Sequence, residues 1–159
     1  MEDQLLSSLM TAYLAQIDSA LKISKIISEH SGDNEGISPD ALILGLIYRL
    51  MIPMEDDEMK ESLKVAKKII EESSSSEESD EDSSVVLHED LNENNISSHE
   101  YSDCVILSKK IKPNTCNCLI CATSRDCLLR FPTYESSDPL AEKFQDAIKN
   151  ACEIHNLHI

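Results

Sequence analysis

Four cysteines stand close together near the C-terminal end of the chain, with the spacing C-x-C-x2-C-x5-C: Cys116, Cys118, Cys121 and Cys127. Zinc in proteins takes four thiolate or imidazole ligands at the corners of a tetrahedron. A tight turn places two or three thiolates on one side of the ion, and Pro-Asn-Thr directly before the run supplies turn-forming residues. The spacing therefore predicts a zinc site made of these four residues.

The fourth ligand has alternatives further along the chain. The terminal run CEIHNLHI offers Cys152 and His155, which would share one side of a helix at their three-residue spacing. Two interpretations without metal also stand, namely buried or redox-active thiols and a set of disulfides. The acidic N-terminal sequence MEDQLLSSLM does not resemble a secretion signal, so we expect an intracellular protein, cytoplasmic or nuclear. Thiols stay reduced there, which favours metal over disulfides.

Motifs of catalysis are not found in the sequence. With three glycines in the whole chain there is no Gly-rich phosphate loop, and neither HExxH nor GxSxG occurs. A reactive thiol, Cys127 or Cys152 activated by His155, is the enzymatic alternative. We expect a protein that is not an enzyme, because little chain surrounds these residues to shape a substrate pocket.

Charge divides the chain into three segments. The formal net charge is −16. Residues 1–70 hold 12 acids and 7 bases, residues 71–103 hold 12 acids and no base, and residues 104–159 hold 6 acids and 7 bases. Such a chain favours protein partners with a basic surface and makes nucleic acid an unfavourable partner. Its longest apolar stretch, residues 41–52, has 12 residues and is too short to span a membrane.

The first segment, 1–70, has the periodicity of a small three-helix module. One apolar face recurs at mostly three- and four-residue spacings: Leu6, Met10, Tyr13, Ile17, Ala20 and Ile27. After the turn SGDNEG, Ser38-Pro39 opens a second helix that is apolar nearly all round, and Pro53 ends it. We expect that helix to be the centre of the module or, alternatively, to dock on a partner. A third helix follows EDDE, with Met59, Leu63, Ala66 and Ile70 on its apolar face.

The second segment, 71–103, is predicted to be a disordered acidic linker, because its serine- and acid-rich start has no apolar residue to bury. Ser74, Ser75 and Ser79 each have an acid three residues downstream, which predicts phosphorylation by an acidophilic kinase. The triplet Val85, Val86 and Leu87, flanked by acids, resembles a SUMO-interacting motif, which adds a strand to the edge of a partner's sheet. The alternative is a plain spacer with a short strand that packs on the protein itself.

The third segment, 104–159, is predicted to be a small Cys-rich α+β module. Residues 103–111 suit a strand, and Asp138-Pro139 begins a helix whose apolar face includes Leu140, Phe144 and Ile148. The run TCNCLIC is similar to the cysteine run of polyomavirus small T antigens, which bind structural zinc and a phosphatase scaffold. The similarity covers seven residues, and the family's His-Pro-Asp signature and later cysteine pairs are absent, so its partners are not transferred.

The whole sequence thus predicts a mainly α, non-enzymatic adaptor or regulator. Its parts would be a helical module, a phosphorylatable acidic tract and a zinc-stabilised C-terminal module. A structural component of a larger assembly, such as a virus particle, is the alternative of a different class.

Overall fold

The fold is taken from a computed structural model, which describes residues 1–75 and 109–159. The described elements, in chain order, are helices α1 (Glu2–His30), α2 (Pro39–Met51) and α3 (Asp56–Ser74), strand β1 (Lys109–Lys110), helix α4 (Leu119–Arg130), a 3-10 turn η2 (Phe131–Thr133), helix α5 (Pro139–Ile154) and strand β2 (Leu157–His158). The two strands pair in parallel, Lys109 with Leu157 and Lys110 with His158. The prediction of a mainly α protein with a little strand near the C-terminus is confirmed.

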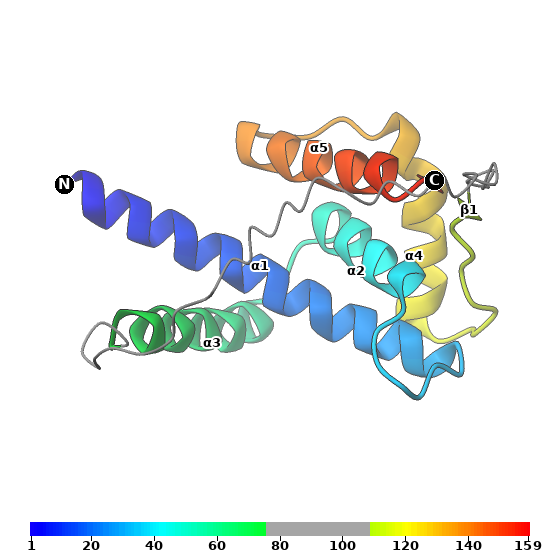
Figure 1. The fold of residues 1–159 in the computed structure, drawn as a ribbon, viewed down its shortest axis with the longest axis horizontal. Helices are drawn as coiled ribbons and strands as arrows, with labels where there is room; N and C mark the ends of the chain where they lie inside the picture. Colours follow the sequence, from blue (N-terminus) through cyan, green and yellow to red (C-terminus); the bar gives the residue numbers. More distant parts are fainter. Residues whose placement is uncertain (76–108) are drawn as a thin grey trace, which may run out of the picture.

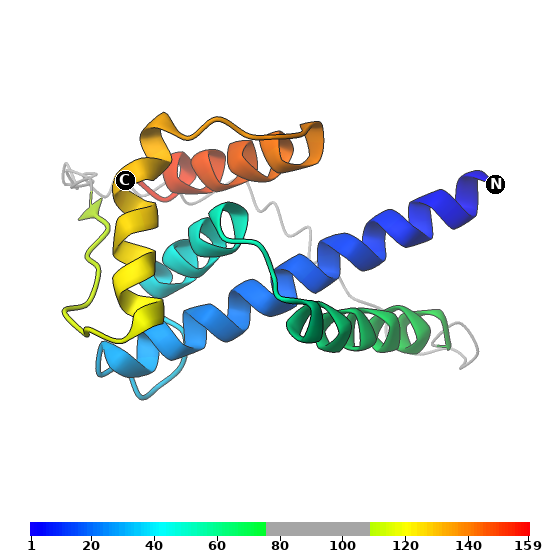
Figure 2. The same cartoon turned by 180° about the vertical axis from the view of Figure 1, so that it is seen from behind.

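Helix α1 is the longest helix and runs obliquely along most of the length of the molecule (Figures 1 and 2). Helices α2 and α3 both pack along α1, and α4 and α5 pack on the other side of α2. The end of α1 lies beside the start of α4, in both views. Segments that are far apart in the sequence therefore meet at this corner.

Helix α2 approaches α1 closely through small residues. A side chain on Gly45 would collide with the Ser24 hydroxyl and would lie 2.6 Å from the carbonyl oxygen of Ala20, so only glycine fits. The predicted start of α2 is confirmed, because Ser38 caps the helix by accepting a hydrogen bond from the Ala41 N–H. The prediction that α2 is central is also confirmed, since its apolar residues Ala41, Ile43, Leu44 and Ile47 are buried.

Helix α3 is held against α1 by small and polar residues more than by apolar bulk. Ser62 and Ala66 are fully buried, whereas Met59, expected on the apolar face, is 41% exposed. The Glu58 carboxylate accepts hydrogen bonds from Ser19 of α1 and from Arg49 of α2, at 2.5 and 2.7 Å. These contacts join the three N-terminal helices across their polar seams.

One core runs through both the N-terminal helices and the Cys-rich segment. Its buried members come from α1 and α2 and from the C-terminal elements: Ile23, Ile27, Ala41, Ile43, Leu44, Ile47, Ile111, Cys121, Cys127, Phe131, Ile148 and Cys152. The N-terminal helices and the Cys-rich segment, expected as separate modules, thus share their apolar interior. Each is too small to bury much surface alone, and sharing a core relieves that shortage.

The acidic tract is described only at its start. Helix α3 continues four residues past the expected end of the helical module, to Ser74. Ser74 and Ser75 are exposed at this helix end. The third predicted phosphorylation site, Ser79, and the triplet Val85–Leu87 lie outside the described residues. Among the helices in the described ranges, none has both the length and the apolar character needed to cross a membrane.

Candidate metal centre

Three of the four predicted cysteine ligands lie beside a histidine, His30, that their spacing does not predict. The Nδ1 atom of His30 lies 3.4, 3.3 and 3.4 Å from the sulfur atoms of Cys116, Cys118 and Cys121. All four ligand atoms lie within 4.8 Å of one another. In a tetrahedral site with zinc–sulfur bonds of about 2.3 Å and zinc–nitrogen bonds of about 2.0 Å, nitrogen and sulfur would be about 3.5 Å apart. The group can therefore hold a metal ion.

The fold brings these residues together from two ends of the chain. His30 is the last residue of α1, and 86 positions separate it from Cys116. Cys118 is the N-cap of α4, and Cys121 lies in its first turn. The positive end of the α4 dipole favours thiolate, and the negative end of the α1 dipole favours a cation. Both helix ends thus suit a cation bound by thiolates.

Hydrogen bonds to the sulfur atoms pre-arrange the three cysteines. The backbone N–H of Cys118 donates to the Cys116 sulfur, and that of Cys121 donates to the Cys118 sulfur, each at 3.4 Å. The side-chain amide of Asn114 donates to the Cys121 sulfur at 3.2 Å and to the Ile27 carbonyl of α1 at 3.1 Å. Asn114 thereby ties the cysteine turn to the helix that carries His30. Such supporting donors orient ligands and stabilise thiolate charge.

Arg125 of α4 holds the other side of the same turn. Its guanidinium group donates to the carbonyl oxygens of Asn114 and Cys116, at 3.0 and 2.6 Å. This interaction explains how a helix residue can fix a loop that has no regular structure of its own. The sequence signal for Arg125 was only its nearness to the cysteines, which does not distinguish a loop anchor from a surface base.

The environment shifts the thiol pKa values of Cys118, the N-cap of α4, and Cys121, in its first turn, in opposite directions. The pKa of Cys118 falls to about 6, mainly because the N–H of Cys121 donates to its sulfur. Burial raises the pKa of Cys121 to about 11. Of these two thiols, Cys118 is therefore the one that favours the thiolate without metal, and a bound cation would favour the thiolate of Cys121 as well.

Cys127 is not part of the group, although the spacing made it the first choice as fourth ligand. Its side chain is fully buried in the shared core, and burial raises the pKa of its thiol. Cys152, an alternative ligand, is 4% exposed in the same core. His155, the other alternative, is exposed at the C-cap of α5 and is not in the group. Among the described residues, His30 takes the fourth position instead.

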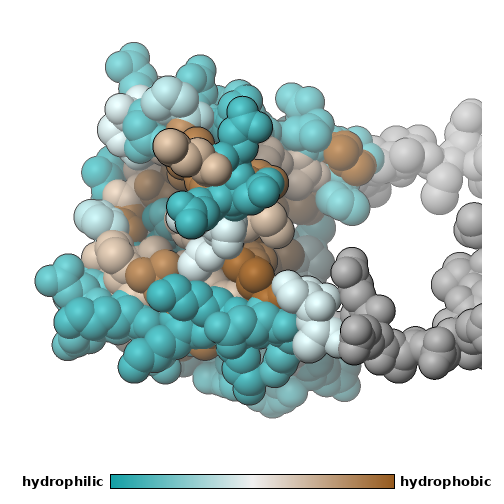
Figure 3. All heavy atoms as spheres, turned by 90° about the vertical axis from the view of Figure 1, so that its left-hand side faces the viewer, coloured by the Kyte–Doolittle hydropathy of each residue, from teal (hydrophilic) through white to brown (hydrophobic). Residues whose placement is uncertain are grey.

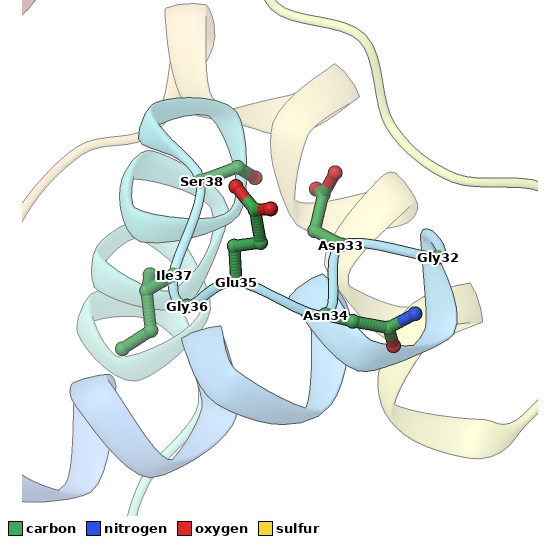
Figure 4. A pocket seen from close by; sticks show the side chains of 7 residues that line it. All are labelled: Gly32, Asp33, Asn34, Glu35, Gly36, Ile37 and Ser38. Carbon is green, nitrogen blue, oxygen red and sulfur yellow. The ribbon is translucent and has the colours of Figure 1, made fainter.

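The loop after His30, residues 31–38, lines a shallow hollow of about 510 Å³ that is open to solvent (Figure 4). Gly32 and Gly36 have positive φ angles of 84° and 135°, which glycine adopts without strain. The Ser28 hydroxyl donates to the Gly36 carbonyl and so pins the loop to α1. The carboxylates of Asp33 and Glu35 are exposed, and we assign the hollow no ligand. Its role is to turn the chain directly after His30.

The search among known proteins gave no relative. No family model matches the chain, and no curated protein or solved structure matches it either. The short similarity to the small T antigens therefore has no support beyond its seven residues.

Proposed function

We propose that the chain is a protein-binding adaptor whose fold is held by one structural zinc ion at His30, Cys116, Cys118 and Cys121. The observation that carries the proposal is the position of His30, whose Nδ1 atom is nearly equidistant from three sulfur atoms at 3.3–3.4 Å. Three thiolates and one imidazole are a ligand set that zinc takes in structural sites. Mg²⁺ and Ca²⁺ prefer oxygen ligands, so they fit this set poorly.

A structural role follows from the number of ligands. Catalytic zinc usually keeps one coordination position open for water or substrate, whereas four protein ligands fill a tetrahedral shell. Here the ion would join the C-terminal end of α1 to the N-terminal end of α4. It would thereby clamp the Cys-rich segment onto the N-terminal helices.

The adaptor role is supported by the acidic net charge of the chain and by the pairing of basic residues near the cysteines. The strongly acidic chain suits a partner with a basic surface. Several bases near the cysteines already have partners, because Arg125 holds the cysteine turn, Arg130 pairs with Asp126 at 2.7 Å, and Lys109 lies 3.7 Å from Asp40. These engaged bases make a phosphate-binding surface at the cysteine turn a weaker proposal than protein binding.

Elemental analysis of the purified full-length chain tests the zinc proposal. We expect one zinc per chain, and X-ray absorption should show three sulfur ligands near 2.3 Å and one nitrogen ligand near 2.0 Å. His30→Ala and the double variant Cys116→Ser, Cys121→Ser should lower the zinc content or affinity. Cys127→Ser and His155→Ala are matched controls that should keep one zinc. A chain without metal, or His155→Ala losing it, would refute the assignment.

A reactive thiol is the second candidate function, favoured by the lowered pKa of Cys118. It differs from the zinc proposal in how the protein reacts as isolated. A catalytic thiolate would alkylate rapidly at neutral pH with no treatment. A zinc ligand would alkylate slowly until a chelator is added.

A further inference from the structure

The first third of α1 carries an apolar face that the described part of the chain leaves exposed. Every residue from Met1 to Met10 is exposed. Leu5, Leu6, Leu9 and Met10 are 69, 59, 49 and 50% exposed. The periodicity of the sequence predicts burial for Leu6 and Met10, and the fold leaves both in contact with solvent.

This part of α1 is amphipathic, but its apolar face points to solvent and its polar face points toward α3. At about 100° per residue, Leu5, Leu6, Leu9, Met10 and Tyr13 lie on one face. The opposite face carries Ser7, Ser8 and Thr11, and those are the residues that line a small hollow with the end of α3. The helix thus turns polar side chains toward its neighbour and apolar ones away, which indicates a surface made for a partner.

The apolar face leads into a pocket of about 300 Å³ between α1, the end of α2 and α5. Tyr13, the last residue of this apolar face, packs edge-on against Phe144 of α5, with ring centres 5.9 Å apart. Leu140 and Met51 also line the pocket. Figure 3 looks onto this side of the molecule and shows apolar residues gathered in the middle, bordered by hydrophilic ones. We call the face formed by Leu5, Leu6, Leu9, Met10 and Tyr13, together with this pocket, the α1 groove.

Two buried polar atoms at the pocket have no hydrogen-bond partner among the described residues. They are Nε of Arg49 and Oε1 of Gln16, and both residues line the pocket. Arg49 is 3% exposed, and its terminal nitrogens already bind Glu58 and the Ile52 carbonyl. Unpaired buried polar groups cost free energy, so the described part of the chain leaves a cost beside this pocket.

The charges around the α1 groove select the kind of partner. Glu2 and Asp3 stand at its outer end and Asp138 lines the pocket, whereas the cation at the pocket, Arg49, is paired with Glu58. A second copy of this chain would bring like charges together, and each copy carries a net charge of −16. A partner with basic residues beside its apolar ones would be attracted.

We propose that the α1 groove binds an amphipathic helix of another protein, with basic residues flanking its apolar face and one large apolar side chain in the pocket. Such helix-in-groove recognition uses anchors at three- and four-residue spacings, which match those of the apolar α1 face. A pocket of this size accepts a leucine or phenylalanine side chain. The inference rests on the proposed adaptor role but not on the zinc ion, so the elemental analysis and the binding test can fail separately.

The test uses the full-length chain and a synthetic helical peptide of roughly 14 residues, which at about 1.5 Å per residue is longer than the apolar face from Leu5 to Tyr13 and so covers it. Its apolar face is leucine and its polar face is lysine, and a matched peptide carries glutamate for every lysine. Binding is measured by fluorescence anisotropy at physiological salt, and the mass of the free protein by light scattering. We expect a monomer that binds the lysine peptide and not the glutamate peptide.

Variants then locate the binding site. Leu9→Glu on α1 and Leu140→Glu on α5 should each weaken binding of the lysine peptide at least about tenfold. Leu129→Glu, on α4 and at a position 80% exposed, is the matched control and should bind like the parent. Circular dichroism and zinc content should be the same for all three variants. A dimer that Leu9→Glu dissociates, a monomer that binds neither peptide, equal binding of both peptides, or equal weakening by Leu129→Glu would each overturn the proposal.

Discussion

The strongest test of the metal centre is how much zinc stabilises the fold, and how much of that stabilisation is lost when the single ligand His30 is removed. The three cysteines lie close together in sequence and can share an ion even in the unfolded chain. His30 would then have to close a loop of 86 residues to reach that ion, whereas in the fold it is already beside them. Removing His30 therefore removes most of the link between zinc binding and folding.

The magnitude follows from the length of the loop. The chain-entropy expression for a crosslink gives about 15 cal/mol/K for a loop of this length, or about 4.6 kcal/mol at 25 °C. This is the upper limit of what the His30–zinc bond adds to the free energy of unfolding, because zinc bound to the unfolded chain reduces the effect. For a chain of this size, it corresponds to about 9–18 °C in Tm.

The assay is thermal unfolding by circular dichroism with zinc and with a chelator. On metal removal, the Tm of the parent chain should fall by up to about 9–18 °C, whereas the Tm of His30→Ala should fall by only a few degrees. His155→Ala, the matched histidine change outside the group, should behave like the parent. A parent chain with the same Tm in zinc and in chelator would refute the clamp. A His30→Ala variant whose Tm differs between zinc and chelator as much as that of the parent would also refute it.

Three further predictions follow from the described contacts. Gly45→Ala should destabilise the chain by about 1–3 kcal/mol in urea unfolding, because the new methyl group overpacks the α1–α2 contact; Ser24→Ala in the same chain should not restore stability, since backbone atoms of α1 remain in the way. Glu58→Gln should cost about 3 kcal/mol by leaving the buried Arg49 guanidinium without its counter-charge, and an unchanged unfolding midpoint would contradict that account. In the metal-free protein, Cys118 should alkylate first. Its rate should rise as pH passes about 6 and level off above, because the thiolate form is then complete; a rate that still climbs at pH 8–9 would show an ordinary thiol.

Much of the helical structure was predictable because its signals are local. The N-caps Ser38 and Asp138, each followed by proline, begin helices where expected. The run around Pro53 separates α2 from α3 as expected. These signals depend on backbone groups within a few residues, so no knowledge of the tertiary fold is needed to read them.

The metal group was predictable only in part. Cys116, Cys118 and Cys121 stand out by spacing, and they do lie together. Cys127 has the same residue type and a plausible spacing, but its position on α4 buries its side chain in the shared core, away from the other three cysteines. The one local hint of His30 was its position at a predicted helix end, in a segment that contains no other histidine.

The sequence alone determined where α2 and α5 begin, where charge accumulates, and which three thiols are adjacent, because these depend on neighbouring residues. Only the tertiary structure decided that α1 delivers His30 to those thiols, that Cys127 and Cys152 fill the core, and that the apolar start of α1 stays exposed. Each of these depends on which surfaces meet across dozens of residues. That choice is made by the packing of the whole core, and local periodicity does not encode it.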